Sequence, residues 1–190
     1  MKNTLILGIG CGAQNIINKI KNEITGENYL IIGANEMILK ASSVPTLLFP
    51  DRSYSDESLG CAGNVELGES LAKENCSLLN DKLSNIERVI IIACLGGGFG
   101  SGATPVVADY IKNLGIKTDI IVTVPFAFEG KRVSLSAGNC VEKLRDITDN
   151  VTVISNDMIL KKLDKKCRAQ DGFAIVNNVI MLKIKEIIGK

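Results

Sequence analysis

An apolar run followed at once by a run of glycines is the feature that most constrains the fold of this chain. Residues 88–95 read RVIIIACL, and residues 96–102 read GGGFGSG. A continuous apolar run of this length is typical of a central parallel strand that is covered on both faces. Glycine can take positive φ and lets backbone N–H groups crowd around a ligand. The two segments together predict a buried strand that leads into a binding loop.

Strands and helices are predicted to alternate along the whole chain. Further apolar runs predict strands at residues 4–8, 29–34, 46–49, 117–124 and 150–155. Helical spacing and capping residues predict helices at residues 13–24, 64–79 and 134–144, and two more near the end of the chain. A further helix is predicted to run to residue 114, with Pro105 in its first turn. Residues 50–63 are expected to form a loop. With no repeat or linker in 190 residues, we expect one domain with a three-layer, Rossmann-like α/β fold and a mostly parallel sheet.

Composition excludes several classes of site. Lys and Arg number 22 against 21 Asp and Glu, so no electrostatic footprint for nucleic acid exists. The absence of His excludes Ser-His-Asp and Cys-His nucleophile systems and most zinc sites. Aromatic residues are only 4% of the chain, which disfavours base-stacking platforms.

The sequence also predicts the cellular compartment of the protein. No apolar run approaches membrane-spanning length, and the chain starts with a glycine-rich turn rather than a leader peptide. We therefore expect no membrane partner and a cytoplasmic location. The cysteines are expected to be reduced and mostly buried; they are Cys11, Cys61, Cys76, Cys94, Cys140 and Cys167.

The glycine loop at 96–102 predicts an anion-binding site. Its amides can form a nest, and the start of the following helix adds partial positive charge. Ser101 and Thr104 can add hydroxyl donors. The alternative is a glycine-rich turn needed only for tight packing. The loop has no lysine, so it is not a P-loop, and charge neutralisation falls to amides, the helix dipole and a metal ion, with Mg²⁺ expected.

Two further glycine turns precede helices. GIGCGA at 8–13 fits the dinucleotide fingerprint GxGxxA, and Glu36 could act as its ribose-binding acid, so a nicotinamide-dinucleotide domain stays open as an alternative. GCAGN at 60–64 predicts either a second phosphate-facing loop or an ordinary helix-entry turn.

Four segments taken together resemble the FtsZ branch of the tubulin/FtsZ GTPases. They are GIGCGAQN at 8–15, GGGFGSG at 96–102, PFAFEGKR at 125–132 and SNDMIL at 155–160, in the order and spacing of that family. The resemblance covers nearly the whole chain and only the nucleotide-binding half of the family's fold. It implies binding of GTP or GDP, usually with Mg²⁺, and head-to-tail polymerisation among relatives.

The resemblance also implies roles for individual residues. Glu129 would hold the ribose, Asn156 would lie near the base, Phe173 would stack on guanine, and Asn177 would bond its edge. Asparagine carries a donor and an acceptor, so Asn15 and Asn177 suit the amide edge of guanine. No catalytic residue and no metal ligand is assigned. The expected nucleotide-binding residues are Gly10, Cys11, Gly12, Asn15, Gly60, Cys61, Ala62, Gly63, Asn64, Gly96, Gly97, Gly98, Phe99, Gly100, Ser101, Gly102, Glu129, Arg132, Asn156, Phe173 and Asn177.

Simpler roles remain open for three of these residues. Glu129 can be a solvated loop acid, Asn15 a helix-start residue, and Phe173 a core residue. Phe99 and Ser101 stand where the family usually has two threonines, and Phe99 would put bulk beside the phosphates. Other departures are Asn35-Glu36-Met37 in place of Asn-Thr-Asp, Val65 in place of proline, and Val133 in place of an arginine that Arg132 can replace.

The last helix predicts that something covers it. One apolar stripe holds Phe173, Val176, Ile180, Ile184 and Ile187, and a second holds Ile175, Val179 and Leu182 on nearly the opposite side. A missing domain, a second copy of the chain or an FtsZ-type partner would cover the second stripe, unless the helix is sunk in its own domain.

Hydrolysis by this chain alone is expected to be weak or absent. In the family, acidic residues in a loop after this helix complete the GTPase site, and the chain stops at Lys190 before such a loop and before a second domain. A degenerate, non-enzymatic regulator or capping partner of FtsZ-type filaments is therefore a second hypothesis, and the dinucleotide domain is a third.

Overall fold

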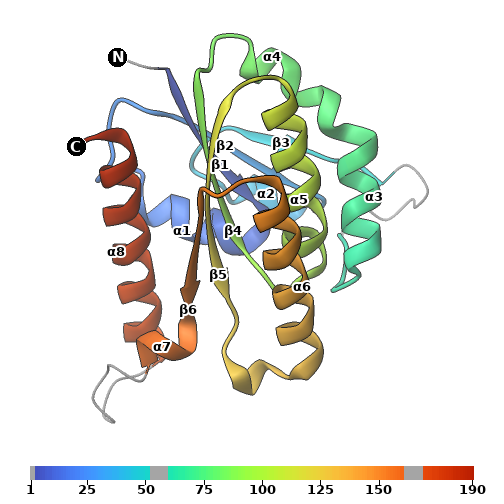
Figure 1. Ribbon diagram of the computed structural model, residues 1–190, viewed down its shortest axis with the longest axis vertical. Coiled ribbons are helices and arrows are strands. Elements are labelled where there is room, and N and C mark those ends of the chain that lie inside the picture. Colours follow the sequence, from blue (N-terminus) through green and yellow to red (C-terminus); the bar gives the residue numbers. More distant parts are fainter. Residues whose placement is uncertain (1–2, 52–59, 161–168) are drawn as a thin grey trace.

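A parallel sheet forms the centre of the protein, seen in a computed structural model that describes residues 3–51, 60–160 and 169–190 (Figure 1). Within these residues the sheet has six strands in the order β3-β2-β1-β4-β5-β6, and all pairings are parallel. This confirms the predicted α/β class with a parallel sheet. The strands are β1 (Thr4–Ile9), β2 (Asn28–Gly33), β3 (Thr46–Leu48), β4 (Arg88–Cys94), β5 (Lys117–Val124) and β6 (Val151–Ser155).

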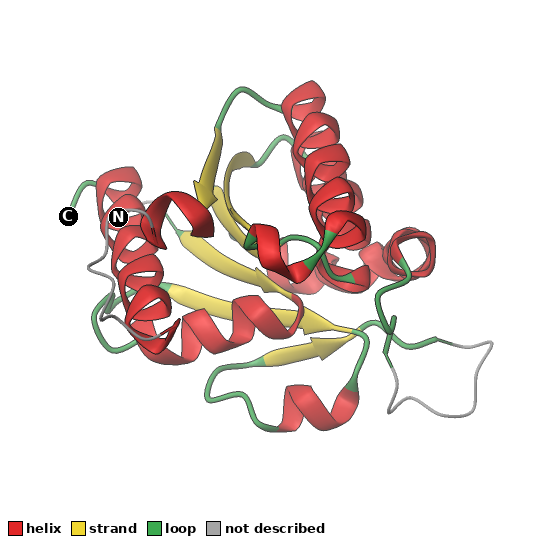
Figure 2. Cartoon of the chain, turned by 90° about the horizontal axis from the view of Figure 1, so that it is seen from below, coloured by secondary structure: helices red, strands yellow, loops and turns green. Residues whose placement is uncertain are grey.

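Helices cover both faces of the sheet and make the outer two layers (Figure 2). One face is covered by α1 (Gly10–Ile20), α2 (Glu36–Lys40) and α8 (Ala169–Ile188), and the other by α3 (Val65–Asn75), α5 (Gly98–Asn113) and α6 (Lys131–Ile147). The shorter helices are the 3-10 turn η1 (Cys76–Leu79), α4 (Asn80–Leu83), the 3-10 turn η2 (Ala127–Glu129) and α7 (Asn156–Leu160).

The central strand β4 is buried on both faces, as its apolar run predicts. Val89 and Ile91 point into the core shared with α3, α5 and α6, whereas Ile90 and Ile92 point into the core shared with α1 and α8. All four side chains are fully buried. Successive side chains of β4 therefore point to opposite faces of the sheet and pack into two separate hydrophobic cores.

The predicted helix starts differ from the observed ones at the glycine loops. α1 begins at Gly10 rather than at residue 13, and α5 begins at Gly98, inside the segment expected to be a loop. The amide of Ser101 already donates to Gly97 O, at 3.1 Å. Pro105 therefore lies inside α5, and its expected place in the first helical turn is wrong. Of the loop predicted at 50–63, residues 52–59 lie outside the described residues, as does Cys167.

Helices α3 and α5 touch through their backbones. A Cβ on Gly102 would lie 2.2 Å from Val65 O, and a Cβ on Gly68 would lie 2.4 Å from Gly98 O. Neither distance is possible for real atoms, so only glycine allows this approach. The tight-packing reading of the glycine run is thus correct for Gly98 and Gly102, whereas Gly97 has open space around its Cβ position.

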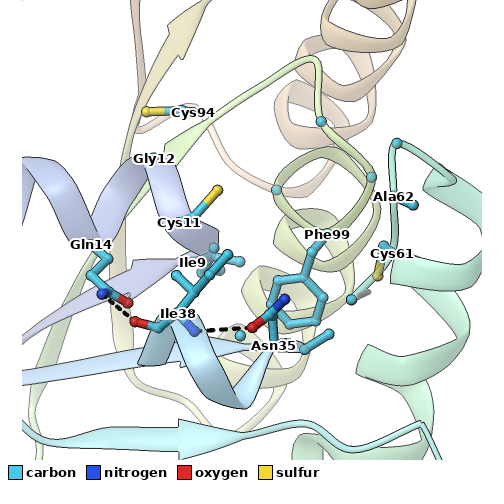
Figure 3. Close-up of a pocket in the computed structure, with 18 of the residues that line it drawn as sticks. Ile9, Cys11, Gly12, Gln14, Asn35, Ile38, Cys61, Ala62, Cys94 and Phe99 are labelled. Carbon is cyan, nitrogen blue, oxygen red and sulfur yellow. Dashed lines mark hydrogen bonds between the residues drawn. The ribbon is translucent and has the colours of Figure 1, made fainter. Parts of the chain in front are cut away.

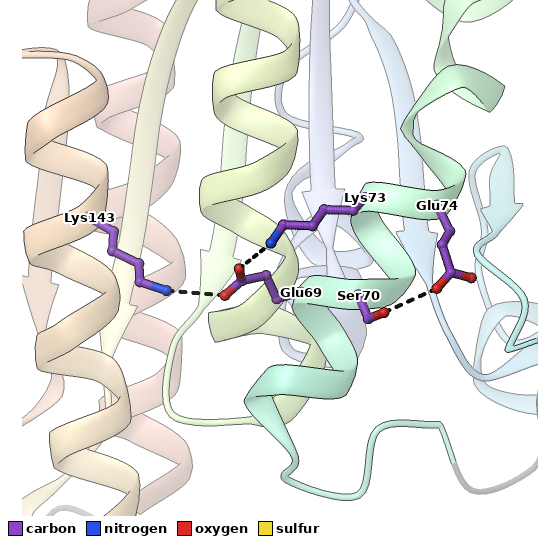
Figure 4. Close-up of polar contacts among 5 residues, drawn as sticks. All are labelled: Glu69, Ser70, Lys73, Glu74 and Lys143. Atoms are coloured by element: carbon purple, nitrogen blue, oxygen red, sulfur yellow. Dashed lines mark hydrogen bonds and ion pairs between the residues drawn. The ribbon is translucent and has the colours of Figure 1, made fainter.

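A carboxylate on α3 links this helix to α6 across the surface (Figure 4). Glu69 accepts from Lys73 Nζ at 2.7 Å and from Lys143 Nζ at 3.1 Å. The hydrogen bonds from Lys73 and Lys143 hold the pKa of Glu69 below its usual range. Exposed ion pairs add little stability; the contact with Lys73 lies within α3, and only the contact with Lys143 joins α3 to α6.

The last helix buries only one of its two apolar stripes. Val176, Ile180 and Ile184 are buried against the sheet, whereas Val179 is 38% and Leu182 is 62% exposed. The alternative that the helix is sunk in its own domain is therefore wrong for this chain. No helix among the described residues is both long enough and apolar enough to span a membrane.

Replacing Gly102 with alanine should destabilise the fold, because the new methyl must push α3 away from α5. We expect a loss of about 1–3 kcal/mol, measured by urea denaturation. The matched control is Gly138→Ala in α6, where nothing lies within 4 Å of the Cβ position. That change should raise stability by about 0.5–1 kcal/mol through helix propensity. Equal effects of the two substitutions would contradict the packing argument.

Candidate functional site

The two central strands, β1 and β4, define the natural place for a ligand. They are neighbours in the sheet, and the chain leaves them toward opposite edges, to β2 and to β5. Ligands of such sheets bind outside the carboxyl ends of the strands at this switch point. α1 and α5 both begin here, and a Cβ on Gly10 would lie 3.7 Å from Gly100 N. The amino ends of two helices therefore meet at one crevice.

A cavity of about 280 Å³ lies at this crevice, and we call it the amide cavity (Figure 3). Its wall also includes the turn that precedes α3 and the start of α2. Three glycine turns that are far apart in the sequence thus meet, as the strand-to-helix order predicts. The predicted site residues on this wall are Gly10, Cys11, Gly12, Gly60, Cys61, Ala62, Gly63, Gly97, Gly98, Phe99 and Gly100.

The amide cavity has the electrostatics of an anion site without a charged side chain. The first N–H groups of a helix have no intrahelical acceptor, and no side chain caps α1 or α5. Neither helix has an acid in its first turn. Among the described residues, the wall includes no Asp, Glu, Lys or Arg. The positive ends of two helix dipoles therefore act on the cavity, although Asp51 and Glu129 lie close enough to act electrostatically on Cys61 and Cys94 of its wall.

Phe99 lines the amide cavity, and most of it is buried. Its ring is 8% exposed and meets Phe49 edge to face, with centroids 6.1 Å apart. Both rings belong to the core between the sheet and α5. Phe99 forms part of the cavity wall, and its backbone N–H at the start of α5 is independent of its side chain.

A second cavity of about 920 Å³ adjoins the first, and we call it the aromatic cavity. It shares Gly12 and Cys94 with the amide cavity. Phe126 and Phe128 stack with centroids 4.9 Å apart, and Phe173 meets Phe126 edge to face at 5.7 Å. Three of the five phenylalanines in the chain thus line one cavity, although aromatic residues are rare in the composition.

Amide and carboxylate side chains complete the aromatic cavity. Asn15, Asn156, Asn177 and Glu129 all line it. Asn156 Oδ1 is buried and has no hydrogen-bond partner within the protein. Glu129 Oε1 accepts the N–H of Phe126 at 2.8 Å, so this acid orders its loop and is more than a solvated loop acid. Phe173 is 47% exposed and is therefore not a core residue.

Other predicted residues lie away from both cavities. Asn64 caps α3 by accepting from Leu67 N at 3.0 Å. Gly96, Ser101 and Arg132 line a third cavity, of about 460 Å³, between α3 and α6. Gly102 lies in the contact between α3 and α5.

Both hydroxyls expected as ligand donors make hydrogen bonds within the protein, but only that of Thr104 uses its O–H as the donor. Ser101 Oγ accepts from Gly96 N at 2.7 Å. The Thr104 hydroxyl is fully buried and donates to Gly100 O. Glu36 forms an ion pair with Lys40 at the surface, at 3.2 Å, and lines neither cavity. The dinucleotide alternative therefore loses the acid that was expected to bind the ribose.

Several cavity residues were missed in the sequence, among them Phe126 and Phe128 of the aromatic cavity and the two that follow. Gln14 lines the amide cavity, and its polar side chain next to Asn15 inside the motif was the available signal. Cys94 lines both cavities, but as the last residue of an apolar strand it gave no signal. Burial raises the pKa of the Cys94 thiol to about 11.

The fold and the joined cavities define an α/β protein of the class that holds its ligand at the carboxyl edge of a parallel sheet. The model of the tubulin/FtsZ family GTPase domain matches residues 3–164. The chain therefore belongs to the tubulin/FtsZ family.

Individual relatives agree with this assignment. Cell division protein FtsZ of Buchnera aphidicola (subsp. Acyrthosiphon pisum) is 34% identical over 176 residues, which are 92% of this chain and 46% of the relative. FtsZ of Wigglesworthia glossinidia brevipalpis is 32% identical over 183 residues, 96% of this chain and 47% of the relative. The chain thus spans about half the length of these relatives.

Solved structures show the same fold. The FtsZ dimer of M. jannaschii superposes with a TM-score of 0.88 at 28% identity, covering 99% of this chain and 55% of that one. CetZ2 from Haloferax volcanii, solved as a GTPγS-bound protofilament, gives a TM-score of 0.83 at 21% identity and covers 98% of this chain and 58% of that one.

Thiol labelling should single out Cys11 at the amide cavity. Cys11 is exposed, whereas burial raises the pKa of Cys61 to about 11 and of Cys76 and Cys140 to about 12. Because the thiolate is the nucleophile, these raised pKa values keep the buried thiols protonated well above neutral pH. In a Cys167→Ser background at about pH 8, a maleimide should label one site, identified by mass spectrometry as Cys11. Equally fast labelling of Cys61 or Cys94 would contradict the burial described.

Proposed function

We propose that this domain binds GTP or GDP across the two joined cavities, with the phosphates in the amide cavity and guanine in the aromatic cavity. The observation that carries the proposal is the junction at Gly12 and Cys94, where an anion-attracting cavity opens into one lined by aromatic rings and amides. A nucleotide has this same division into an anionic tail and an aromatic, hydrogen-bonding base.

The phosphate end is supported by backbone rather than by side chains. The first residues of α1 and α5 line the cavity together with the turn before α3. The N–H groups at a helix start bind anions through hydrogen bonds and through the helix dipole together. The first N–H groups of a helix lack acceptors within the helix. The oxygens of a bound phosphate would accept hydrogen bonds from these N–H groups.

The base end is supported by a ring and by buried amides. Phe173 offers a half-exposed face, and an aromatic ring can stack on any base. Asn156 Oδ1 is a buried acceptor that lacks a donor, and the edge of guanine offers an amino donor beside a carbonyl acceptor. Asn177, 9% exposed, carries both kinds of group. Glu129 lines the same cavity, and in this proposal its second carboxylate oxygen accepts from the ribose hydroxyls.

The exposed stripe on α8 supports association with another surface. Val179 and Leu182 lie on the side of the helix that faces away from the sheet. Apolar side chains in a row on an outer face are typical of an interaction site. A further domain, a second copy of this chain or an FtsZ-type partner would bury them.

Nucleotide binding is tested by titrating the purified chain with fluorescently labelled GDP and, in parallel, with NADH. We expect saturable binding of the guanine nucleotide, competed by GTP and weakly by ATP, and none of NADH. Phe173→Ala should weaken GDP binding by about tenfold or more, because stacking of a base on an aromatic ring is worth about 1–3 kcal/mol.

The matched control is Leu182→Ala, which removes an exposed apolar side chain from the opposite side of α8. It should leave the affinity for GDP unchanged. Tight NADH binding, or loss of GDP affinity in both variants alike, would count against the proposed placement of the base.

Hydrolysis by the purified 190-residue chain should be slow, on the order of 10⁻³ s⁻¹ or less at saturating GTP with Mg²⁺. The reason is that the described wall of the amide cavity has no carboxylate to orient and activate an attacking water. Phosphate release followed over hours measures the rate. Turnover of about one per second would refute the expectation and also the alternative that the chain is a non-enzymatic regulator of FtsZ-type filaments.

A further inference from the structure

The aromatic cavity lies where two neighbouring strands end and their chains part. β5 and β6 pair in parallel up to Val124 and Ser155, the last residues of the two strands. Beyond this pair the chain leaves β5 for η2 and α6, which packs on one face of the sheet. It leaves β6 for α7 and α8, and α8 packs on the other face (Figure 1). The cavity is therefore lined by two segments that the strand pairing no longer joins.

Each of these segments carries one part of the proposed nucleotide site. Glu129 in η2 is proposed to accept from the ribose, whereas Asn156 at the start of α7 is proposed to bond the base, and both residues line the aromatic cavity. Within a nucleotide the ribose and the base are covalently joined at a fixed distance. Both contacts can therefore form together only if the two segments are held in one relative position.

A carboxylate joins the two segments directly. Asp157, the second residue of α7, accepts the backbone N–H of Ala127 through Oδ2 at 3.0 Å. Ala127 is the first residue of η2, and Glu129 is its last. Glu129 in turn accepts the N–H of Phe126 at 2.8 Å. η2 is thus tied to α7 through Asp157 and closed on itself through Glu129.

Asp157 acts on the site from outside the ligand space. It is half-buried and lines neither the aromatic nor the amide cavity. A second contact between the two segments is the edge-to-face pair of Phe126 and Phe173, at 5.7 Å. Aromatic rings can slide over one another at little cost, whereas a hydrogen bond from an N–H to a carboxylate is directional and strong. The bond from Ala127 to Asp157 is therefore the contact that fixes where η2 lies.

We propose that Asp157 is a positioning residue that holds Glu129 at the ribose while Asn156 holds the base. The inference rests on the proposed binding of GTP or GDP across the two cavities. Without the hydrogen bond from Ala127, η2 can shift away from α7, and the second carboxylate oxygen of Glu129 then loses its place at the ribose hydroxyls. Asn156 keeps its own place, because it follows directly after β6.

The experiment measures how strongly the domain prefers GDP over 2′,3′-dideoxy-GDP, each as a competitor of fluorescently labelled GDP. The dideoxy compound keeps guanine and the phosphates but lacks the hydroxyls proposed to donate to Glu129. For the wild type we expect a preference of about tenfold, because hydrogen bonds to charged groups are strong. In Asp157→Ala the preference should fall to about twofold or less. Asp157→Asn keeps an oxygen that can accept from Ala127 and should restore most of it.

Ala127→Pro removes the other half of the same hydrogen bond without changing α7. Proline has no N–H and suits the first position of a helical turn. Phe126 before it already has an extended backbone, with φ −70° and ψ 148°, as a residue before proline requires. We expect the same loss of preference as in Asp157→Ala. The double variant should lose no more than either single variant, because all three lack one and the same interaction.

The preference for GDP over IDP serves as the control ligand pair. IDP lacks only the amino group of guanine, so this ratio reports on the base end alone. In Asp157→Ala it should stay within about twofold of its wild-type value. The matched control variant is Met158→Ala, since Met158 is the next residue of α7, is 62% exposed and lines neither cavity. It should leave both preferences unchanged. Circular dichroism and urea denaturation check the fold of each variant.

Three results would overturn the inference while leaving nucleotide binding intact. The first is a wild-type protein that does not distinguish GDP from the dideoxy compound. The second is an unchanged preference in Ala127→Pro, which decides the matter even where Asp157→Ala fails to fold. The third is an equal fall of both preferences in Asp157→Ala, which would mean that Asp157 supports the whole cavity and does not position Glu129. Absence of GDP binding under every condition would instead contradict the proposed function, and the inference with it.

Discussion

The backbone contact between α3 and α5 is the constraint on which the site depends. Because Gly68 and Gly102 have no side chains, the two helices approach until backbone meets backbone. This approach fixes the amino end of α5 at the carboxyl end of β4, beside the amino end of α1. It also brings the turn before α3 against the same crevice. The amide cavity is thus a consequence of how closely two helices pack behind it.

The same constraint explains why one glycine run serves two purposes. Gly98 and Gly102 are required where the helices touch, and Gly96 adopts a φ of 107° at the end of the strand. Gly97 meets nothing within 4 Å and faces open space on the cavity wall. In a sequence, glycines needed for packing and glycines at a ligand site look alike; the structure shows the packing role for Gly98 and Gly102, and the ligand role of the run belongs to the proposed function.

The fold was predictable because each strand has its own apolar run and each helix its own spacing, and these are local properties. The meeting of the glycine turns followed from the rule that parallel strands end at one edge. The fate of Phe99 was not predictable, since its partner Phe49 lies 50 positions away in the sequence. The contact between Phe126 and Phe173 could not be predicted from the low overall content of aromatic residues. The hydrogen bond from Gln14 to Ile38 O could not be predicted either, because it joins two separate helices. What escapes the sequence is the contact between distant elements.

A site made of backbone amides and a site made of side chains tolerate change differently. At the amide cavity the N–H groups of Phe99 and Cys11 are present whatever side chain follows them, provided that the helix start is held in place. A phenylalanine can therefore stand where relatives have a small residue, as long as its ring finds room in the core beside Phe49. Asn156, Asn177 and Phe173 line the aromatic cavity, and in the proposed binding mode they contact the base through their side chains, which no backbone group can replace. Under the proposed binding mode, substitutions should accordingly disturb the phosphate end less than the base end.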